Sequence, residues 1–218
     1  MTPDPPPARP AGPGAAVATA QDVRRVAPSL DDLRVLAEVV RTCTACAELA
    51  ATRTRVVPGV VPAGARLMVV GEAPGAQEDE TGRPFVGRSG QLLDVLLAEV
   101  GVARTDVAVL NTLKCRPPGN RPPTRPESAA CRPWTERQLE LAAPAVVVAL
   151  GLSATRWFLG PTSLTAVRGR VHEVAGLRVV PTYHPSAALR GGPQGEPRRL
   201  LREDLAMATT LLPPGPPA

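Results

Sequence analysis

Four cysteines are the residues of this 218-residue chain whose type and spacing most clearly suggest metal chemistry. Cys43 and Cys46 form a C-x2-C pair, which places two thiolates within reach of one metal centre. Cys115 and Cys131 follow singly and complete a set of four sulfur ligands, which suits either zinc or an iron–sulfur cluster. Zinc sites more often use two close pairs, so the 15 residues between Cys115 and Cys131 favour a cluster. Zinc and four unrelated buried thiols stay open as alternatives.

A turn dense in glycine and proline, residues 71–87, carries a second group of reactive side chains. Its glycines let the backbone approach a ligand closely, and free N–H groups at a helix start favour an anion. Glu72, Glu78 and Asp79 are nevertheless an odd choice for a phosphate site, because carboxylates repel phosphate. They suit the activation of water or the readout of a base better. A structural turn would explain the glycines but not three acids close to Phe85, which follows a proline.

His184 is one of only two histidines in the chain and lies in the segment YHPS at 183–186. A lone histidine is usually structural, and this is our interpretation of His172, which lies in an expected hairpin at 168–179. His184 differs because it directly follows an apolar run that we expect to be a strand. In an open α/β sheet, the ligand site lies at that end of the strands.

The strands that must position these residues are four short apolar runs rich in valine and leucine, at 67–70, 107–110, 146–150 and 179–181. Each is nearly continuous in apolar residues, as expected for strands that are covered on both faces. Helical patterns separate them, so we predict a mostly parallel sheet with helices on both faces. The unusual segments begin at Gly71, Asn111 and Tyr183, where the strands end.

The helices are expected where apolar residues recur every three or four positions. This pattern predicts helices over 33–40, 91–100, 129–141, 151–160 and 198–212. Ser29 is the expected start of the first of them, because acidic residues follow it in the first turn.

The ends of the chain differ in composition from the middle. Residues 1–28 are rich in proline and alanine and poor in large apolar side chains, so we expect a disordered tail there. Residues 213–218 have the same character. The folded domain is therefore expected at 29–212, a size that fits one α/β domain.

A formal net charge of +5 suits a polyanionic partner such as a nucleic acid. Residues 112–137 hold six basic side chains, among them Lys114, the only lysine of the chain. We find no apolar run near the ~20 residues of a membrane span and no secretory signal. We therefore expect a cytoplasmic, reducing compartment, where cysteines are more often metal ligands than disulfides.

Three motifs and the four cysteines together resemble the family 4 uracil-DNA glycosylases. The motifs are GEAPGAQED with GRPFVG at 71–79 and 82–87, NTLKCRPP at 111–118, and HPS at 184–186. The resemblance spans residues 33–212 and implies a three-layer α/β/α fold with a central four-stranded parallel sheet. It also implies a structural [4Fe–4S] cluster on the four cysteines. The implied activity is that of a monofunctional enzyme of base excision repair, which removes uracil from DNA and leaves an abasic site.

The resemblance assigns the base pocket to three residues. Phe85 would stack on the flipped uracil, and Asn111 would pair with its O4/N3 edge. An amide supplies one acceptor and one donor, which match N3–H and O4 of uracil. Cytosine presents the opposite pattern and would leave buried groups unpaired. His184 would donate to O2, where negative charge collects as the base leaves.

The remaining assignments concern the thymine methyl, the water and the DNA. Glu78 would lie near C5 of the base and disfavour a methyl group there. The backbone around Glu72 and Ala73 would line the pocket. The family 1 enzymes carry an aspartate at the place of Ala73, so Glu72 is the nearest acid here and the expected residue to position water. Leu189 would fill the gap left by the flipped base, and Arg190 would contact a phosphate.

Two other classes of protein were compared with this interpretation. A non-catalytic nucleic-acid-binding module with a four-cysteine zinc site explains the charge and the thiols, but not Phe85, Asn111 and His184 at strand ends. A nucleotide hydrolase would use the glycine-rich turn, but the chain lacks a Walker lysine there. We expect the partner to be uracil-containing DNA, single- or double-stranded, and the enzyme to be a monomer. The N-terminal tail could recruit a repair or replication protein.

Overall fold

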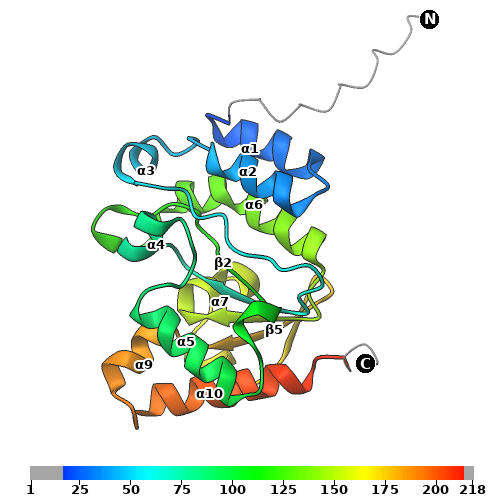
Figure 1. Ribbon diagram of the computed structural model, residues 1–218, viewed down its shortest axis with the longest axis vertical. Coiled ribbons are helices and arrows are strands. Elements are labelled where there is room, and N and C mark those ends of the chain that lie inside the picture. The colour runs from blue at the N-terminus through cyan, green and yellow to red at the C-terminus, as the bar shows by residue number, and fades with distance from the viewer. Residues whose placement is uncertain (1–16, 214–218) are drawn as a thin grey trace, which may run out of the picture.

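The computed structural model describes residues 17–213, which form a sheet between layers of helices (Figure 1). The parts of the expected tails at 1–16 and 214–218 lie outside the described residues. The N-terminal boundary of the fold comes earlier than predicted, because α1 spans Ala20–Val26 within the expected tail and a 3-10 turn follows at Ala27–Ser29. Val17, Val23 and Val26 are buried in one core cluster with Trp134. Three valines and a capping box at Thr19 suffice to order a stretch that its average composition assigned to disorder.

The sheet contains five strands in the order β2-β1-β3-β5-β4. Four of them pair in parallel and correspond to the four predicted apolar runs: β1 Leu67–Gly71, β2 Val107–Asn111, β3 Val146–Leu150 and β5 Leu177–Thr182. The fifth strand, β4 His172–Val174, pairs antiparallel with β5 at the edge. The resemblance implied a four-stranded sheet without this strand, whereas the hairpin expected at 168–179 is confirmed by the antiparallel pairing of β4 with β5.

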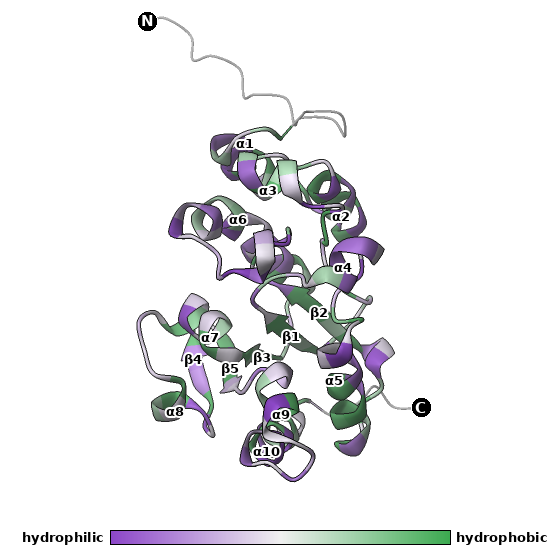
Figure 2. Ribbon diagram, turned by 90° about the vertical axis from the view of Figure 1, so that its left-hand side faces the viewer, coloured by the Kyte–Doolittle hydropathy of each residue, from purple (hydrophilic) through white to green (hydrophobic). Residues whose placement is uncertain are grey.

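Helices cover both faces of the sheet, as predicted. One face packs against α5 Arg88–Glu99, α9 Pro185–Gly191 and α10 Glu196–Thr210, through apolar residues such as Leu93 and Leu205. The other face packs against α6 Arg125–Ala142 and α7 Gly151–Leu159, through residues such as Leu139 and Ala154. Figure 2 shows apolar colouring concentrated on β1 and β2 between these layers. The short helices α4 Ala76–Thr81 and α8 Leu164–Val167 lie in connecting segments.

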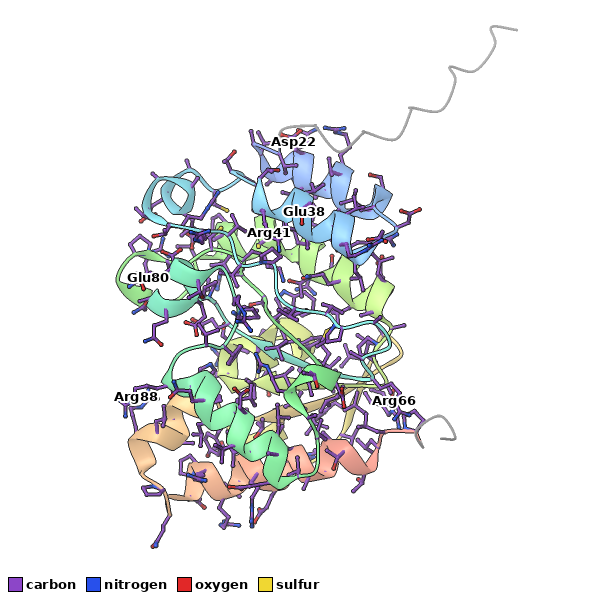
Figure 3. The ribbon with its side chains drawn as sticks, in the orientation of Figure 1. Asp22, Glu38, Arg41, Arg66, Glu80 and Arg88 are labelled. Atoms are coloured by element: carbon purple, nitrogen blue, oxygen red, sulfur yellow. The ribbon has the colours of Figure 1, made fainter. Side chains whose placement is uncertain are left out.

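A further group of helices, α1, α2 Leu33–Arg41 and α3 Ala47–Thr52, lies at the end of the molecule beyond α6 (Figures 1 and 2). In α2, Leu36 and Val40 are buried, whereas Glu38 and Arg41 form an exposed ion pair of 2.6 Å (Figure 3). The helix starts later than the predicted Ser29, because the carboxylate of Asp32 accepts hydrogen bonds from the first free N–H groups. Within residues 17–213, no helix has the length and apolar character needed to cross a membrane.

Candidate functional site

A cavity of about 500 Å³ opens at the carboxyl ends of the parallel strands. This is the edge at which an open α/β sheet binds ligands. Six side chains or backbone segments singled out from the sequence line this cavity together: Glu72, Ala73, Glu78, Phe85, Asn111 and His184. They come from three separate segments of the chain, the turn at 71–87, the end of β2 and the segment after β5, which the sheet brings to one place.

Asn111 is the last residue of β2 and is only 2% exposed. Its side-chain oxygen Oδ1 is buried and has no hydrogen-bond partner. Leaving a buried acceptor unsatisfied costs about 1–3 kcal/mol, so such an atom calls for an explanation. Because Asn111 also lines the cavity, the amide is an acceptor available to a ligand there.

Phe85 lies opposite Asn111 with its backbone in the left-handed region, at φ 53°. This conformation is unfavourable for a bulky residue and is typical of functional sites. The ring is buried, and its centroid lies 5.9 Å from that of the His184 ring. Two glycines permit this placement. A Cβ at Gly90 would lie 1.8 Å from the main-chain oxygen of Phe85, and one at Gly71 would lie 2.6 Å from its Cζ.

Gly71→Ala should therefore disable the cavity directly. The added Cβ would also lie 2.4 Å from Asn111 Oδ1, so Phe85 and Asn111 would have to move apart. A displacement of about 1 Å costs roughly 10²-fold in rate when a substrate must be held accurately, and we expect a loss of that size in kcat/KM. Gly64 has open space around it but a left-handed φ of 72°, so Gly64→Ala is the control for backbone strain: it should cost some stability and leave kcat/KM unchanged. Equal kinetics for the two variants would contradict the assigned crowding.

Glu78 lies in the cavity wall, but its carboxylate is engaged by the backbone. Oε1 accepts hydrogen bonds from the N–H groups of Val86 and Gly87, both at 2.9 Å, and Oε2 accepts one from Gly75 at 3.1 Å. These contacts fasten the turn that carries Phe85. The structure thus gives Glu78 a holding role that the sequence did not suggest.

Glu72 is the first residue after β1 and lines the cavity. Its main-chain oxygen accepts hydrogen bonds from Leu113 N and Thr112 Oγ1, both at 2.9 Å. The pairing of β1 with β2 therefore continues past the last residues of the strands. It fixes Glu72 and Asn111 relative to each other.

His184 forms the N-cap of α9, and its protonation follows from its contacts. Nδ1 accepts a hydrogen bond from the main-chain N–H of Ser186 at 3.1 Å and lies 2.9 Å from Ser186 Oγ. Because a backbone N–H can only donate, Nδ1 holds a lone pair, and in the neutral ring the proton is on Nε2. Burial, and next the charge of Arg190, lower the pKa of His184 to about 4. The ring is neutral at pH 7 and offers one N–H donor.

Histidine ¹⁵N NMR tests this protonation state. The ordinary pKa is 6.5 and the folded value about 4, so we expect His184 to keep the neutral Nε2–H form from pH 8 to pH 5. The unfolded chain binds the proton in the window between these values, so the contribution of His184 to stability falls as the pH falls through it. The signals of His172, the other histidine of the chain, are recorded in the same spectra as an internal comparison. A His184 titration with a midpoint near 6.5 would contradict the assignment.

The structure does not bring Leu189 and Arg190 into the cavity. Both lie on α9, whereas Leu189 was expected to fill the gap left by a flipped base and Arg190 to contact a phosphate. Leu189 is half-buried and packs against the core cluster that includes Leu201 and Leu205. Arg190 is exposed. Leu189 would have to leave this packing to enter DNA.

The four cysteines line a second, smaller cavity beside α6. Cys43 and Cys46 lie between α2 and α3, Cys115 follows β2, and Cys131 lies in α6. All four are free thiols. Among residues 17–213, no group of three or more histidine, cysteine or acidic side chains converges as for a single metal ion. The four cysteines instead line a small space whose wall is otherwise mainly apolar, with residues such as Leu49, Leu113 and Trp134.

Two N–H groups point at these sulfur atoms. Arg53 donates from its guanidinium to Cys115 Sγ at 3.3 Å, and the main-chain N–H of Lys114 donates to Cys131 Sγ at 3.3 Å. Burial raises the pKa of Cys115 to about 12 and also raises the pKa of Cys131. As thiolates these sulfur atoms therefore need a cationic centre among them.

The chain has clear relatives of known type. The model of the uracil DNA glycosylase superfamily matches residues 58–206. A type-4 uracil-DNA glycosylase of Thermotoga maritima is 45% identical over 183 residues, which cover 83% of this chain and 94% of that relative. The chain belongs to the type-4 uracil-DNA glycosylase family.

Two other relatives place the chain within the superfamily. A type-4 uracil-DNA glycosylase of Pyrobaculum aerophilum is 41% identical over 81% of this chain and 92% of that relative. A type-5 uracil-DNA glycosylase of the same organism is 40% identical, but over only 61% of this chain and 66% of that relative. The family membership confirms the resemblance seen in the motifs. The comparisons give no support to a non-catalytic zinc module.

The cavity of this glycosylase-family chain also includes residues that sequence reasoning missed. Asn120, Arg121 and Ser153 contribute to its wall. Arg121 is held there by Glu127, with N···O distances of 2.9 and 2.7 Å, and by Glu48 of α3 at 3.1 Å. Asn120 and Arg121 lie in the long connection after β2, and this position at a strand's carboxyl end was the signal available.

Proposed function

We propose that the chain flips uracil out of DNA into the cavity and hydrolyses its N-glycosidic bond, leaving an abasic site for base excision repair. The observation that carries this proposal is the buried, unpartnered Oδ1 of Asn111 in a cavity shared with Phe85 and His184. The N3–H of uracil supplies the missing donor. The names of the relatives support the same substrate.

Recognition has to offset the cost of extruding the base, which is a few kcal/mol. In the proposal, the ring of Phe85 supplies stacking and the amide of Asn111 pairs with O4 and N3–H. Cytosine carries an amino group and an unprotonated N3 at these positions, so its hydrogen-bond pattern opposes that of the amide. A site built around hydrogen bonds rejects such a base strongly.

In the chemical step, the bond between C1′ and N1 breaks and its electron pair passes to the base. Negative charge then develops on O2, and the neutral Nε2–H of His184 donates to it. Glu72 positions the water that adds to C1′. One hydrogen of this water stays on the new hydroxyl group, and the other leaves as a proton. The chain's only lysine, Lys114, lies in the wall of the cysteine cavity, so no lysine of the base cavity can form a Schiff base. This favours a monofunctional glycosylase.

We infer that the four cysteines hold one [4Fe–4S] cluster. Four sulfur ligands, an apolar surround and N–H groups directed at sulfur are what such a cluster requires. When bound, the cluster serves as a structural crosslink between the α2–α3 segment, the residues after β2, and α6. No step of the uracil chemistry passes through it.

The proposed DNA substrate leads to expectations for the compartment, the oligomeric state and the DNA contacts of the enzyme. We propose that the enzyme acts as a monomer on single- or double-stranded DNA in the cytoplasm, associated with the nucleoid when it is bound. Arg190 is exposed on α9 and is proposed to contact a phosphate, with Leu189 entering the duplex only if α9 rearranges. The proposed recruitment of a repair partner rests on residues 1–16, outside the described part of the chain.

The test is strand cleavage at abasic sites. Cluster-loaded protein is incubated with oligonucleotides that differ only in carrying uracil, thymine or cytosine at one position, and the products are treated with alkali. We expect cleavage of the uracil strand alone. Absence of cleavage, or equal cleavage of the thymine strand, would overturn the proposal.

A further inference from the structure

Lys114 is the only lysine of the chain and is 1% exposed. Its ammonium group donates to the main-chain oxygen of Asn111 at 2.7 Å and to Gln138 Oε1 at 2.6 Å. Both acceptors are neutral oxygens. A buried charge is ordinarily paired with an opposite charge, so the position of Lys114 points to an anionic neighbour.

The cysteines of the second cavity, as thiolates, would supply this negative charge. Lys114 lines this cavity together with the four cysteines, and it immediately precedes Cys115 in the chain. Four thiolates around an iron–sulfur core carry more negative charge than the iron balances, so a nearby ammonium stabilises the assembly. The main-chain N–H of Lys114 donates to Cys131 Sγ, and its ammonium donates to the carbonyl of Asn111, the residue proposed to pair with uracil.

One face of α6 anchors this arrangement. Cys131, Thr135 and Gln138 lie four and three positions apart, which places them on the same side of a helix. Cys131 Sγ accepts from the main-chain N–H of Lys114, Thr135 Oγ1 donates to the main-chain oxygen of Thr112 at 3.3 Å, and Gln138 accepts from the Lys114 ammonium. The segment between the uracil pocket and the cluster ligands is thus held by three successive contacts.

We propose that Lys114 is a positioning residue that couples the two sites, as the counter-charge of the cysteine-held cluster and as the support of the Asn111 backbone. The inference rests on the proposed uracil chemistry and on the proposed cluster. It assigns Lys114 no contact with the base. Loss of its ammonium should loosen the cluster and misplace the amide of Asn111 together.

The test uses two variants of the full chain. Lys114→Met keeps the length of the side chain but removes its charge and its donors. In this variant Gln138 Oε1 would be left unsatisfied, so the double variant Lys114→Met/Gln138→Met removes that acceptor as well. Because it also removes the hydrogen bond from Gln138 Nε2 to the main-chain oxygen of Pro58 at 2.9 Å, Gln138→Met alone is measured beside it as a control for lost packing. Arg34→Met removes one positive charge from an exposed side chain and is the control.

Two measurements are made on each variant. The first is the rate at which a chelator removes iron, followed by visible absorption. The second is kcat/KM for uracil release by protein with full iron content. Replacing residues that orient metal ligands typically costs about 10–100-fold in metal affinity or activity, and we expect changes of this size in both measurements for the double variant. Arg34→Met should match the wild type in both.

A double-mutant cycle distinguishes coupling through Asn111 from a merely structural role of Lys114. If Lys114 acts through Asn111, the double variant should change kcat/KM by less than about 2-fold in an Asn111→Ala background, because the amide to be positioned is gone. Iron loss should still be faster in that background. An equal fall of kcat/KM in both backgrounds would overturn the coupling, as would a double variant that alters only one of the two measurements. Failure of the wild type to release uracil would instead refute the proposed function.

Discussion

Asn111→Ala should reduce kcat/KM for uracil release by at least about 10²-fold, with no loss of stability. The catalytic loss follows from the proposed site, in which the amide supplies both hydrogen bonds that distinguish uracil from cytosine. The preserved stability follows because Oδ1 has no partner in the folded chain. Removing an unsatisfied buried acceptor removes a desolvation cost of about 1–3 kcal/mol, which offsets the packing lost with the side chain.

The measurement pairs single-turnover kinetics with thermal unfolding of the same protein. Asn111→Asp is the matched control, because it keeps the shape but replaces the donor by an acceptor. It should also lose uracil activity, since O4 would face an oxygen instead of an N–H. Retention of wild-type kinetics by either variant would show that Asn111 does not read the base. A large fall in stability with Asn111→Ala would show instead that the amide serves the fold.

The second large effect is expected at Cys131, which is 8% exposed in the middle of α6. Cys131→Ser should abolish the visible absorption expected of the proposed cluster and lower the free energy of unfolding by at least about 3 kcal/mol, because the binding energy of a structural metal centre is part of the folding energy. For a chain of this size that loss corresponds to a decrease in Tm of roughly 10 °C. Visible absorption and iron content follow the cluster, and calorimetry measures Tm and the free energy of unfolding.

Two results would contradict the cluster. A wild-type protein that is colourless and contains zinc would establish the alternative metal. A Cys131→Ser protein with unchanged iron content would remove Cys131 from the ligand set. Thr42→Ser serves as the control, since Thr42 is an exposed residue beside the first cysteine whose hydroxyl bonds only the carbonyl of Val39.

The sequence was sufficient to predict the parallel strands and the edge of the sheet that carries the site. Apolar runs fully buried on both faces have few other structural solutions, and β3 ends where its run ends. The rule that ligands lie beyond the carboxyl ends of strands brought Glu72, Asn111 and His184 together before any geometry was known. The four cysteines could also be recognised from the sequence as one set, although their spacing did not identify a metal.

Other features depend on contacts that no local pattern encodes. Helix α1 and the residues just before it contribute three valines to a core cluster with Trp134 of α6, which is distant in the sequence. The residues of β4 were expected only as part of a hairpin, and their antiparallel pairing with β5 adds a fifth strand that no apolar run marks. Glu78 looks like a reactive acid in the sequence, yet its carboxylate holds three N–H groups of the turn. Arg121 enters the cavity wall through ion pairs with residues of two other segments.

The identity of the released product tests the central claim most directly. Wild-type, iron-loaded protein is mixed with an oligonucleotide that contains one uracil, and both the free bases and the intact strand are measured by mass spectrometry without alkali. We expect one molecule of free uracil for each abasic strand, with every phosphodiester bond intact and no free cytosine or thymine. An intact strand without free uracil, or a strand cut without base release, would contradict the assignment of this cavity to uracil excision.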